Sequence, residues 1–152
     1  MQFAATVVEG IRDAADRIQA TAANCPNTRI VLGGFSQGAA VIDALAIANQ
    51  PTLGFTNLLP AAAADHVAAV AVFGNPSIRL LGGPLTSLSP QYGYKTIDLC
   101  NGADPVCSHG DDRPAHSLYV EAGMTTQAAQ FVAQRLNTQA PITTLAGQTQ
   151  GS

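Results

Sequence analysis

The residues most able to do chemistry lie in the stretch 30–41, IVLGGFSQGAAV, where an apolar run meets an alanine-rich run. Residues 34–38, GFSQG, match the pattern G-x-S-x-G, which is typical of a serine nucleophile held at a tight strand-to-helix turn. In such a turn the hydroxyl projects above the sheet edge, and the next backbone N–H, from Gln37, points to the same place. The positive end of the new helix adds to this anion site. The pattern therefore predicts Ser36 as a nucleophile.

Two other functions are compatible with glycines around a serine. Small residues allow close packing, so the stretch could be a packing turn without chemistry. A phosphate-binding loop is less well supported, because no Lys-Ser or Lys-Thr pair closes the glycines.

A serine hydroxyl needs a base, and the chain has three histidines that could supply one. His66 precedes an expected strand and is interpreted as a surface or capping residue. His109 and His116 lie in the irregular segment 100–119, CNGADPVCSHGDDRPAHSLY, downstream of the serine. Partners in the order serine, acid, histidine are typical of the nucleophile-elbow enzymes.

The same irregular segment holds the candidate acids Asp104, Asp111 and Asp112. A carboxylate that orients an imidazole must itself be held still, which favours a position directly after a strand. Asp104 meets this condition because it follows the strand expected to end at Leu99. Asp111 and Asp112 are expected in a mobile loop.

The three cysteines, Cys25, Cys100 and Cys107, leave at least one without a partner inside the chain. A bridge between Cys100 and Cys107 would hold Asp104 in a small ring, worth about 2.5 kcal/mol by the chain-entropy estimate. The competing interpretation is a metal site of Cys100, Cys107, His109 and His116. The cysteine spacing is wider than that of a usual zinc pair, so no metal is predicted.

Hydrophobic periodicity shows which elements must position these residues. Apolar residues at helical spacing predict a first helix up to the break at CPNT, and 38–48 and 125–136 predict two more. In the last helix Ala129, Phe131, Val132 and Leu136 are expected to face inward. Continuous apolar runs predict buried strands at 29–34, 66–76 and 94–100. This alternation predicts an α/β fold with a parallel sheet covered on both faces.

Composition limits the functional class. A chain of 152 residues fits one domain, and only 11% of its residues are charged, against roughly 25% in an average soluble domain. The net charge is -3 and no basic run occurs, so nucleic acid is not an expected partner. No apolar run approaches the roughly 20 residues of a membrane span. Oligomeric state cannot be predicted from this sequence.

Taken together, the motifs resemble those of the cutinases, small serine esterases of the three-layer α/β-hydrolase fold, and especially the mycobacterial cutinase-like proteins. The resemblance rests on CPNTRIVLGGFSQGAAVID, DHVAAVAVFGNP and KTIDLC, on the C-x-x-x-D-x-x-C pattern from Cys100 to Cys107, and on the H-x-x-Y of His116 and Tyr119. It continues through GMTTQAAQFVAQRL and reaches Leu136. The family usually has tyrosine where this chain has Phe35.

The resemblance implies a function and a set of site residues. Ser36 would be the nucleophile, His116 the general base and acid, and Asp104 the orienting carboxylate. Gln37 N–H would be one oxyanion donor, and Cys100 and Cys107 would form a disulfide. Such enzymes cleave carboxylic esters, including lipid-like ones, through an acyl-enzyme and without a cofactor.

This sequence also differs from the family pattern at its N-terminal end. Family members carry an N-terminal part with a signal peptide, the opening strands, a partner for Cys25 and a second oxyanion donor. We therefore expect residues 1–137 to form an N-terminally incomplete cutinase-like domain and 138–152 a flexible tail. Secretion is expected from the family. The start of this chain lacks a signal peptide pattern, which predicts a cytoplasmic protein if the chain is expressed as given. The alternative function is a remnant of low activity that at most binds acyl chains.

Overall fold

The fold is centred on a three-stranded parallel sheet. A computed structural model describes residues 2–47 and 59–138. Its strands are β1 (Ile30–Phe35), β2 (Val67–Phe73) and β3 (Thr96–Leu99), in the order β1-β2-β3. Both pairs are parallel, with Leu32 opposite Val70 and Ala71 opposite Ile97. The predicted α/β fold and parallel sheet are confirmed, whereas the predicted tail lies outside the described residues from 139 onward.

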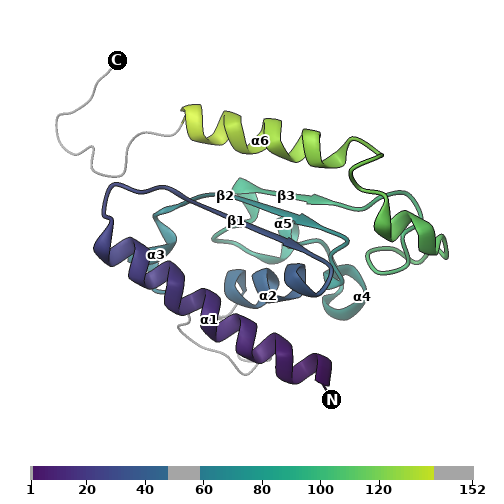
Figure 1. The fold of residues 1–152 in the computed structure, drawn as a ribbon, viewed down its shortest axis with the longest axis horizontal. Coiled ribbons are helices and arrows are strands. Elements are labelled where there is room, and N and C mark those ends of the chain that lie inside the picture. The colour runs from purple at the N-terminus through teal and green to yellow at the C-terminus, as the bar shows by residue number, and fades with distance from the viewer. Residues whose placement is uncertain (1, 48–58, 139–152) are drawn as a thin grey trace.

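Helices cover the two faces of the sheet unequally (Figure 1). The helices α1 (Gln2–Asn24) and α2 (Gln37–Ala46) lie on one face, and α2 contacts β1 while α1 packs on α2. The opposite face carries α6 (Met124–Thr138), which packs on β2 and β3. On that side of β1 the alternate residues Val31 and Phe35 are 40% and 48% exposed.

The hydrophobic core lies between the sheet and the α1–α2 layer. Strand β2 is buried along nearly its whole length, as expected of a strand with neighbours on both sides and helices on both faces. The buried side chains of β2 belong to one hydrophobic cluster with Ile11 and Ile18 of α1 and Ile42 and Leu45 of α2. The helical spacing of these apolar residues therefore determines which face of each helix turns inward.

Five short helical segments in the described part of the chain were not predicted. They are α3 (Ala61–Ala64), α4 (Ser77–Leu81), α5 (Leu85–Leu88) and two 3-10 turns at Gly93–Lys95 and Arg113–Ser117. Pro60, Pro76 and Pro84 directly precede the first three. Proline at a helix start has a favourable φ and loses no hydrogen bond, so these prolines are compatible with the short helices that follow them.

The prediction for the last helix is partly wrong. In α6 Ala128 is buried and Ala129 is exposed, while Phe131, Val132 and Leu136 are half-buried. The face that packs on β2 and β3 therefore includes Ala128 in place of Ala129.

The turn from β1 into α2 depends on one close backbone approach. A Cβ added to Gly34 would lie 2.5 Å from the carbonyl oxygen of Gly38, whereas a Cβ added to Gly38 would meet nothing within 4 Å. Ser36 between them has φ 57° and ψ -115°, and it is the one non-glycine residue with positive φ in the described part of the chain. Such a conformation costs on the order of 1–3 kcal/mol, so the surrounding contacts must hold it.

One buried carboxylate, Asp43, and one half-buried carboxylate, Asp98, lie beneath the carboxyl end of the sheet. Asn75, which follows β2, donates from Nδ2 to Asp43 Oδ1 at 2.8 Å and to Asp98 Oδ2 at 3.0 Å. The Leu85 N–H donates to the same Asp98 oxygen at 2.8 Å. Burial raises the pKa of Asp43 to about 7, with the charge of Asp98 adding to the rise and the Asn75 bond opposing it. The amide of Asn75 thus ties α2, the β2 loop and β3 together.

Substitution of the two turn glycines by alanine will have opposite effects. Gly34→Ala forces the methyl group into the Gly38 backbone and is expected to cost about 3 kcal/mol of unfolding free energy or more, the upper end for overpacking. Gly38→Ala meets no atom, and alanine favours a helix over glycine by about 1 kcal/mol, so it should leave stability unchanged or raised. Urea denaturation of both variants tests this. Equal stabilities would show that strand and helix do not approach as described.

The Asp43 carboxyl makes the free energy of unfolding depend on pH. Its folded pKa of about 7 lies above the ordinary value of 3.8, so its contribution is complete below about pH 4 and is lost as pH rises to about 7. The loss is on the order of 4 kcal/mol. Asp43→Asn keeps an acceptor for Asn75 without the titration, so we expect a variant more stable than wild type at pH 8.

Denaturation in urea at pH 5 and pH 8 measures this difference. Asp16→Asn, an exposed carboxylate on α1, is the matched control and should keep the wild-type pH dependence. An Asp43→Asn variant with the wild-type pH dependence would contradict the assignment.

Candidate active site

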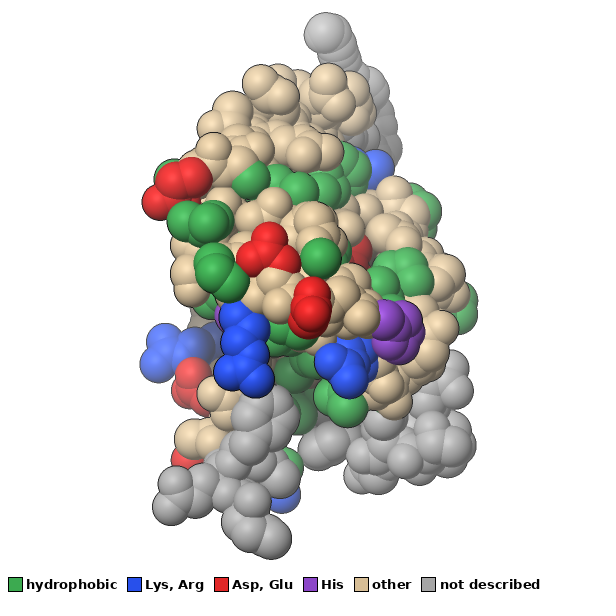
Figure 2. Space-filling view, turned by 90° about the vertical axis from the view of Figure 1, so that its right-hand side faces the viewer, with side chains coloured by type: hydrophobic (Ala, Val, Ile, Leu, Met, Phe, Trp, Pro, Cys, Tyr) green, Lys and Arg blue, Asp and Glu red, His purple; other side chains and the backbone are tan. Residues whose placement is uncertain are grey.

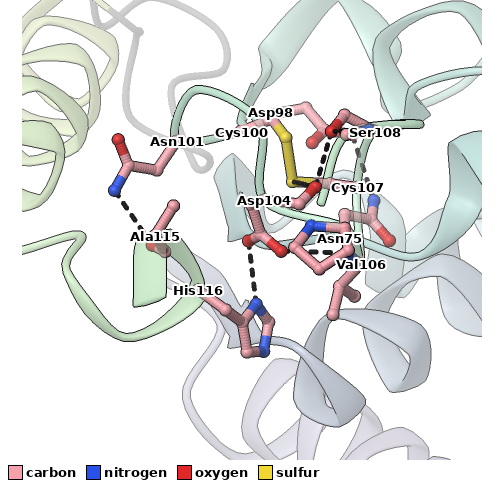
Figure 3. Close-up of a disulfide and its surroundings, with 12 residues drawn as sticks. Asn75, Asp98, Cys100, Asn101, Asp104, Val106, Cys107, Ser108, Ala115 and His116 are labelled. Carbon is pink, nitrogen blue, oxygen red and sulfur yellow. Dashed lines mark hydrogen bonds and ion pairs between the residues drawn. A yellow bond between two sulfur atoms is a disulfide. The ribbon is translucent and has the colours of Figure 1, made fainter. Parts of the chain in front are cut away.

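Three side chains from distant parts of the sequence form a hydrogen-bonded row. His116 Nε2 lies 2.9 Å from Ser36 Oγ, and His116 Nδ1 lies 2.8 Å from Asp104 Oδ2. Ser36 directly follows β1, Asp104 lies in the loop after β3, and His116 lies in the 3-10 turn Arg113–Ser117. Figure 3 shows the imidazole directed at the Asp104 carboxylate. An alcohol, an imidazole and a carboxylate in this order can pass a proton from the alcohol to the ring.

The parallel sheet brings these segments to one edge. Its hydrogen bonding continues past the strand ends, because Ser36 N–H donates to Phe73 O and Gly74 N–H donates to Leu99 O. All three strands therefore deliver their following loops to the same side. Gly74, with φ 57°, leaves room for the ring: a Cβ there would lie 2.9 Å from His116 Cε1.

The Ser36 hydroxyl is directed at the imidazole and not at the helix. A serine at a helix N-cap usually accepts a backbone N–H from the first turn. Ser36 occupies the N-cap of α2 but makes no side-chain cap bond, and its Oγ contacts His116. A turn used only for packing or capping gives no reason for this orientation.

The imidazole is held on its faces as well as at its nitrogens. The Phe35 ring stacks on the His116 ring with centroids 4.8 Å apart, and Tyr119 meets the ring edge-on at 6.5 Å. The His116 side chain is 22% exposed, so one side of the ring is open to solvent. Phe35 in the x position of G-x-S-x-G thus contacts the histidine while Ser36 turns toward its Nε2.

Asp104 is fully buried and receives three hydrogen bonds. Oδ1 accepts the Val106 N–H at 2.8 Å, and Oδ2 accepts from both Tyr119 Oη at 2.6 Å and the His116 ring at 2.8 Å. Burial acts to raise the pKa of Asp104, but the bonds from Tyr119, His116 and Val106 outweigh it and lower the pKa below its ordinary value. The carboxylate is therefore ionised at neutral pH.

A disulfide between Cys100 and Cys107 closes the loop that carries Asp104 (Figure 3). Directly after the loop, the Ser108 hydroxyl donates to the Asp104 carbonyl at 2.6 Å. Because both sulfurs are bonded to each other, they are not available as the metal ligands considered above. Cys25 is exposed and forms no disulfide in the described part of the chain.

The other candidates lie away from the row. His66 Nδ1 contacts Thr28 O at 3.0 Å at the amino end of the sheet. His109, Asp111 and Asp112 are exposed, and no described contact joins their side chains to Ser36. Residues 2–47 and 59–138 contain no cluster of histidine, cysteine and acidic side chains suited to a metal ion.

Gln37 begins α2 directly after the serine. The first N–H groups of a helix have no acceptor within it and point out of its amino end. The backbone N–H of Gln37 belongs to this turn. Its side chain is turned toward α1, where Nε2 lies 3.4 Å from Thr6 Oγ1.

Among the groups that bind Asp104, Tyr119 and Val106 received no role from sequence reasoning. Val106 contributes a backbone group, which no side-chain pattern could indicate. Tyr119 was noted only as part of H-x-x-Y. The one-turn spacing from His116 was the signal that both side chains could meet the same acid.

An open cavity of about 460 Å³ borders the imidazole. It is mainly apolar and is lined by Phe35, Phe73, His116, Ser117, Tyr119, Val120 and Thr125. Figure 2, which faces the right-hand end of the molecule in Figure 1, shows hydrophobic side chains interspersed with single charged ones. Val120 in the wall of this cavity is 70% exposed. No helix in the described part of the chain is long and apolar enough to cross a membrane.

Known proteins with similar sequences include mycobacterial hydrolases. The chain is 58% identical over 128 residues to the phospholipase Culp4 of Mycobacterium tuberculosis, covering 84% of this chain and 56% of that protein. It is 49% identical over 140 residues to the carboxylesterase Culp1 of Mycobacterium bovis, covering 89% and 60%. The chain thus spans about half the length of the curated relatives it matches.

Solved structures agree with these relationships. The catalytic core domain of acetyl xylan esterase from Trichoderma reesei superposes with a TM-score of 0.73 at 30% identity, over 88% of this chain and 72% of that one. The cutinase family model matches residues 1–136. The chain belongs to the cutinase family.

Proposed function

We propose that this chain is a serine esterase that hydrolyses carboxylic esters through an acyl-enzyme. The observation that carries the proposal is the continuous row from Ser36 Oγ through the His116 ring to Asp104, at a serine with φ 57°. A strained serine that gives up its helix cap to contact an imidazole is suited to nucleophilic attack. The carboxylesterase and phospholipase names of the relatives support the same reaction class.

In the proposed reaction, Ser36 Oγ attacks the ester carbonyl carbon while its proton passes to His116 Nε2. Asp104 accepts a hydrogen bond from the Nδ1–H of His116 and stabilises the imidazolium that forms. The tetrahedral intermediate collapses by breaking the bond to the alkoxide, which leaves as an alcohol with the proton from Nε2. Water then attacks the acyl carbon while His116 takes its proton; the bond to Ser36 Oγ breaks, His116 returns the proton to Oγ, and the carboxylic acid is released.

Charge on the carbonyl oxygen needs hydrogen-bond donors. The backbone N–H of Gln37, in the first turn of α2, is the proposed donor from this chain. A second donor, which the family resemblance implies in the N-terminal part that family members carry, would add on the order of 10²–10³ in kcat. The activity of the whole protein is therefore inferred from its relatives as well as from the site.

The proposed substrates are esters with an apolar acyl group. The mainly apolar cavity beside His116 and the exposed Val120 in its wall support this class. The alternative is a protein that binds acyl chains there without turnover. The disulfide supports a proposed location in an oxidising compartment outside the cytoplasm.

Removal of the serine hydroxyl tests the reaction. Ser36→Ala should abolish hydrolysis of a short-chain p-nitrophenyl ester and labelling by a serine-directed phosphonate, because no other group on the chain would form the acyl-enzyme. Ser87→Ala, an exposed serine on α5, is the control and should keep both activities. Turnover that survives Ser36→Ala would rule out the proposed mechanism. Acyl-chain binding with neither labelling nor turnover in wild type would support the alternative function.

The disulfide prediction concerns both stability and activity. Replacing Cys100 and Cys107 together by serine should lower the free energy of unfolding by about 2.5 kcal/mol and release the loop that holds Asp104. We therefore expect lower kcat and little change in KM, because the loop positions the acid and not the substrate. Cys25→Ser is the control, with wild-type stability and turnover. A double variant with wild-type kcat would show that Asp104 is held without the bridge.

A further inference from the structure

The hydroxyl of Tyr119 lies at the centre of the contacts around Asp104. Tyr119 is 5% exposed, and its Oη is 2.6 Å from Asp104 Oδ2, the shortest of the bonds to that carboxylate. The direction of this bond is determined by the neighbours. Oη accepts the Asn101 N–H at 3.0 Å, so its single proton is available for the carboxylate oxygen. Cys107 Sγ, at 3.3 Å, is in a disulfide and carries no proton.

The same carboxylate oxygen, Asp104 Oδ2, also accepts the hydrogen bond from His116 Nδ1. Two donors therefore share Oδ2, while Val106 N–H occupies Oδ1. A donor that shares an oxygen with the imidazole withdraws part of the negative charge that would otherwise act on the ring. Burial raises the pKa of the Tyr119 phenol and the bond to Asp104 raises it further, so the hydroxyl remains a donor throughout the neutral range.

Tyr119 also joins the two chain segments that carry the acid and the base. Its hydroxyl contacts the 100–107 loop at Asn101 and Asp104, while its backbone follows His116 by three residues. The Asn101 side chain makes a parallel connection from Nδ2 to Ala115 O at 2.9 Å (Figure 3). The Tyr119 ring is held edge-on by Phe35 and Phe73, with centroids 5.8 and 6.0 Å away.

We infer that Tyr119 is a positioning residue for the proposed reaction: its hydroxyl orients the Asp104 carboxylate toward His116 and moderates the pull of that carboxylate on the ring. The inference rests on the proposed function. Among the described residues, the charged group that acts on the Tyr119 hydroxyl is Asp104. The titratable side chains that act on Asp104 are Tyr119 and His116. A tyrosine kept only for packing would need its ring and not its hydroxyl.

The test compares two variants that each remove one buried phenol hydroxyl. Tyr119→Phe keeps the ring packing. Tyr92→Phe is the matched control, because Tyr92 is 1% exposed in the core and its hydroxyl has no hydrogen-bond partner among the described residues. Both variants and wild type are made as the full 152-residue chain. The His116 ring is titrated by NMR, with His116→Gln used to assign its signals.

In Tyr119→Phe the Asp104 carboxylate keeps more negative charge, so the midpoint of the His116 titration should move up by about one pH unit. This is a tenfold smaller dissociation constant for the proton. Ester hydrolysis should show kcat lowered about tenfold with KM little changed. Tyr92→Phe should match wild type in both measurements. A folded Tyr119→Phe variant with the wild-type midpoint would overturn the inference.

A second substitution keeps the inference testable if Tyr119→Phe does not fold. Site-specific replacement of Tyr119 by 3-fluorotyrosine keeps the hydroxyl and makes it a stronger donor, so the midpoint should move down. An unchanged midpoint there would equally overturn the inference. The titration does not depend on turnover: absence of Ser36-dependent hydrolysis in wild type would refute the proposed function, while the NMR midpoint would still decide the effect of Tyr119 on His116.

Discussion

The buried carboxylate of Asp104 is the constraint on which the rest of the site depends. A charge removed from water is costly unless hydrogen bonds replace its solvation, and Asp104 obtains three such bonds, from Tyr119, Val106 and His116. Those bonds require the 100–107 loop, the turn that carries His116 and Tyr119, and the end of the sheet to lie together. The disulfide reduces the freedom of the loop, so the acid meets the imidazole in one orientation.

The serine is positioned by backbone strain. Strand β1 must turn at once into α2, and the absence of a side chain on Gly34 lets the helix backbone pass beside the strand. Ser36 then adopts φ 57°, which places its hydroxyl toward His116 and not over the helix end. The two constraints are complementary, because the rigid edge formed by β1, β2 and β3 holds the strained turn and the buried acid at a fixed separation.

Polar groups beneath the sheet edge support the same arrangement. Asn75 joins Asp43 of α2 to Asp98 of β3, and the preceding Gly74 leaves the space that the His116 ring occupies. The backbone that makes room for the base is thus anchored by a buried amide. The carboxyl that this amide binds, Asp43, has a pKa raised to about 7 by burial. Stability and site geometry are therefore coupled through one loop.

The sequence by itself determined the strands, the main helices and the parallel α/β class, because the spacing of apolar residues along the chain can be read without knowing any tertiary contact. It also determined the candidates Ser36 and Asp104, through the spacing of glycines and cysteines, while only the resemblance to the cutinases selected His116 over His109. The short helices after Pro60, Pro76 and Pro84, and the buried face at Ala128, depended on packing that no local pattern encodes. Only the tertiary structure decided which hydroxyl meets which oxygen. The contacts of Tyr119, Val106 and Asn75 join segments distant in sequence, and their partners are chosen by the meeting of strand ends at one sheet edge.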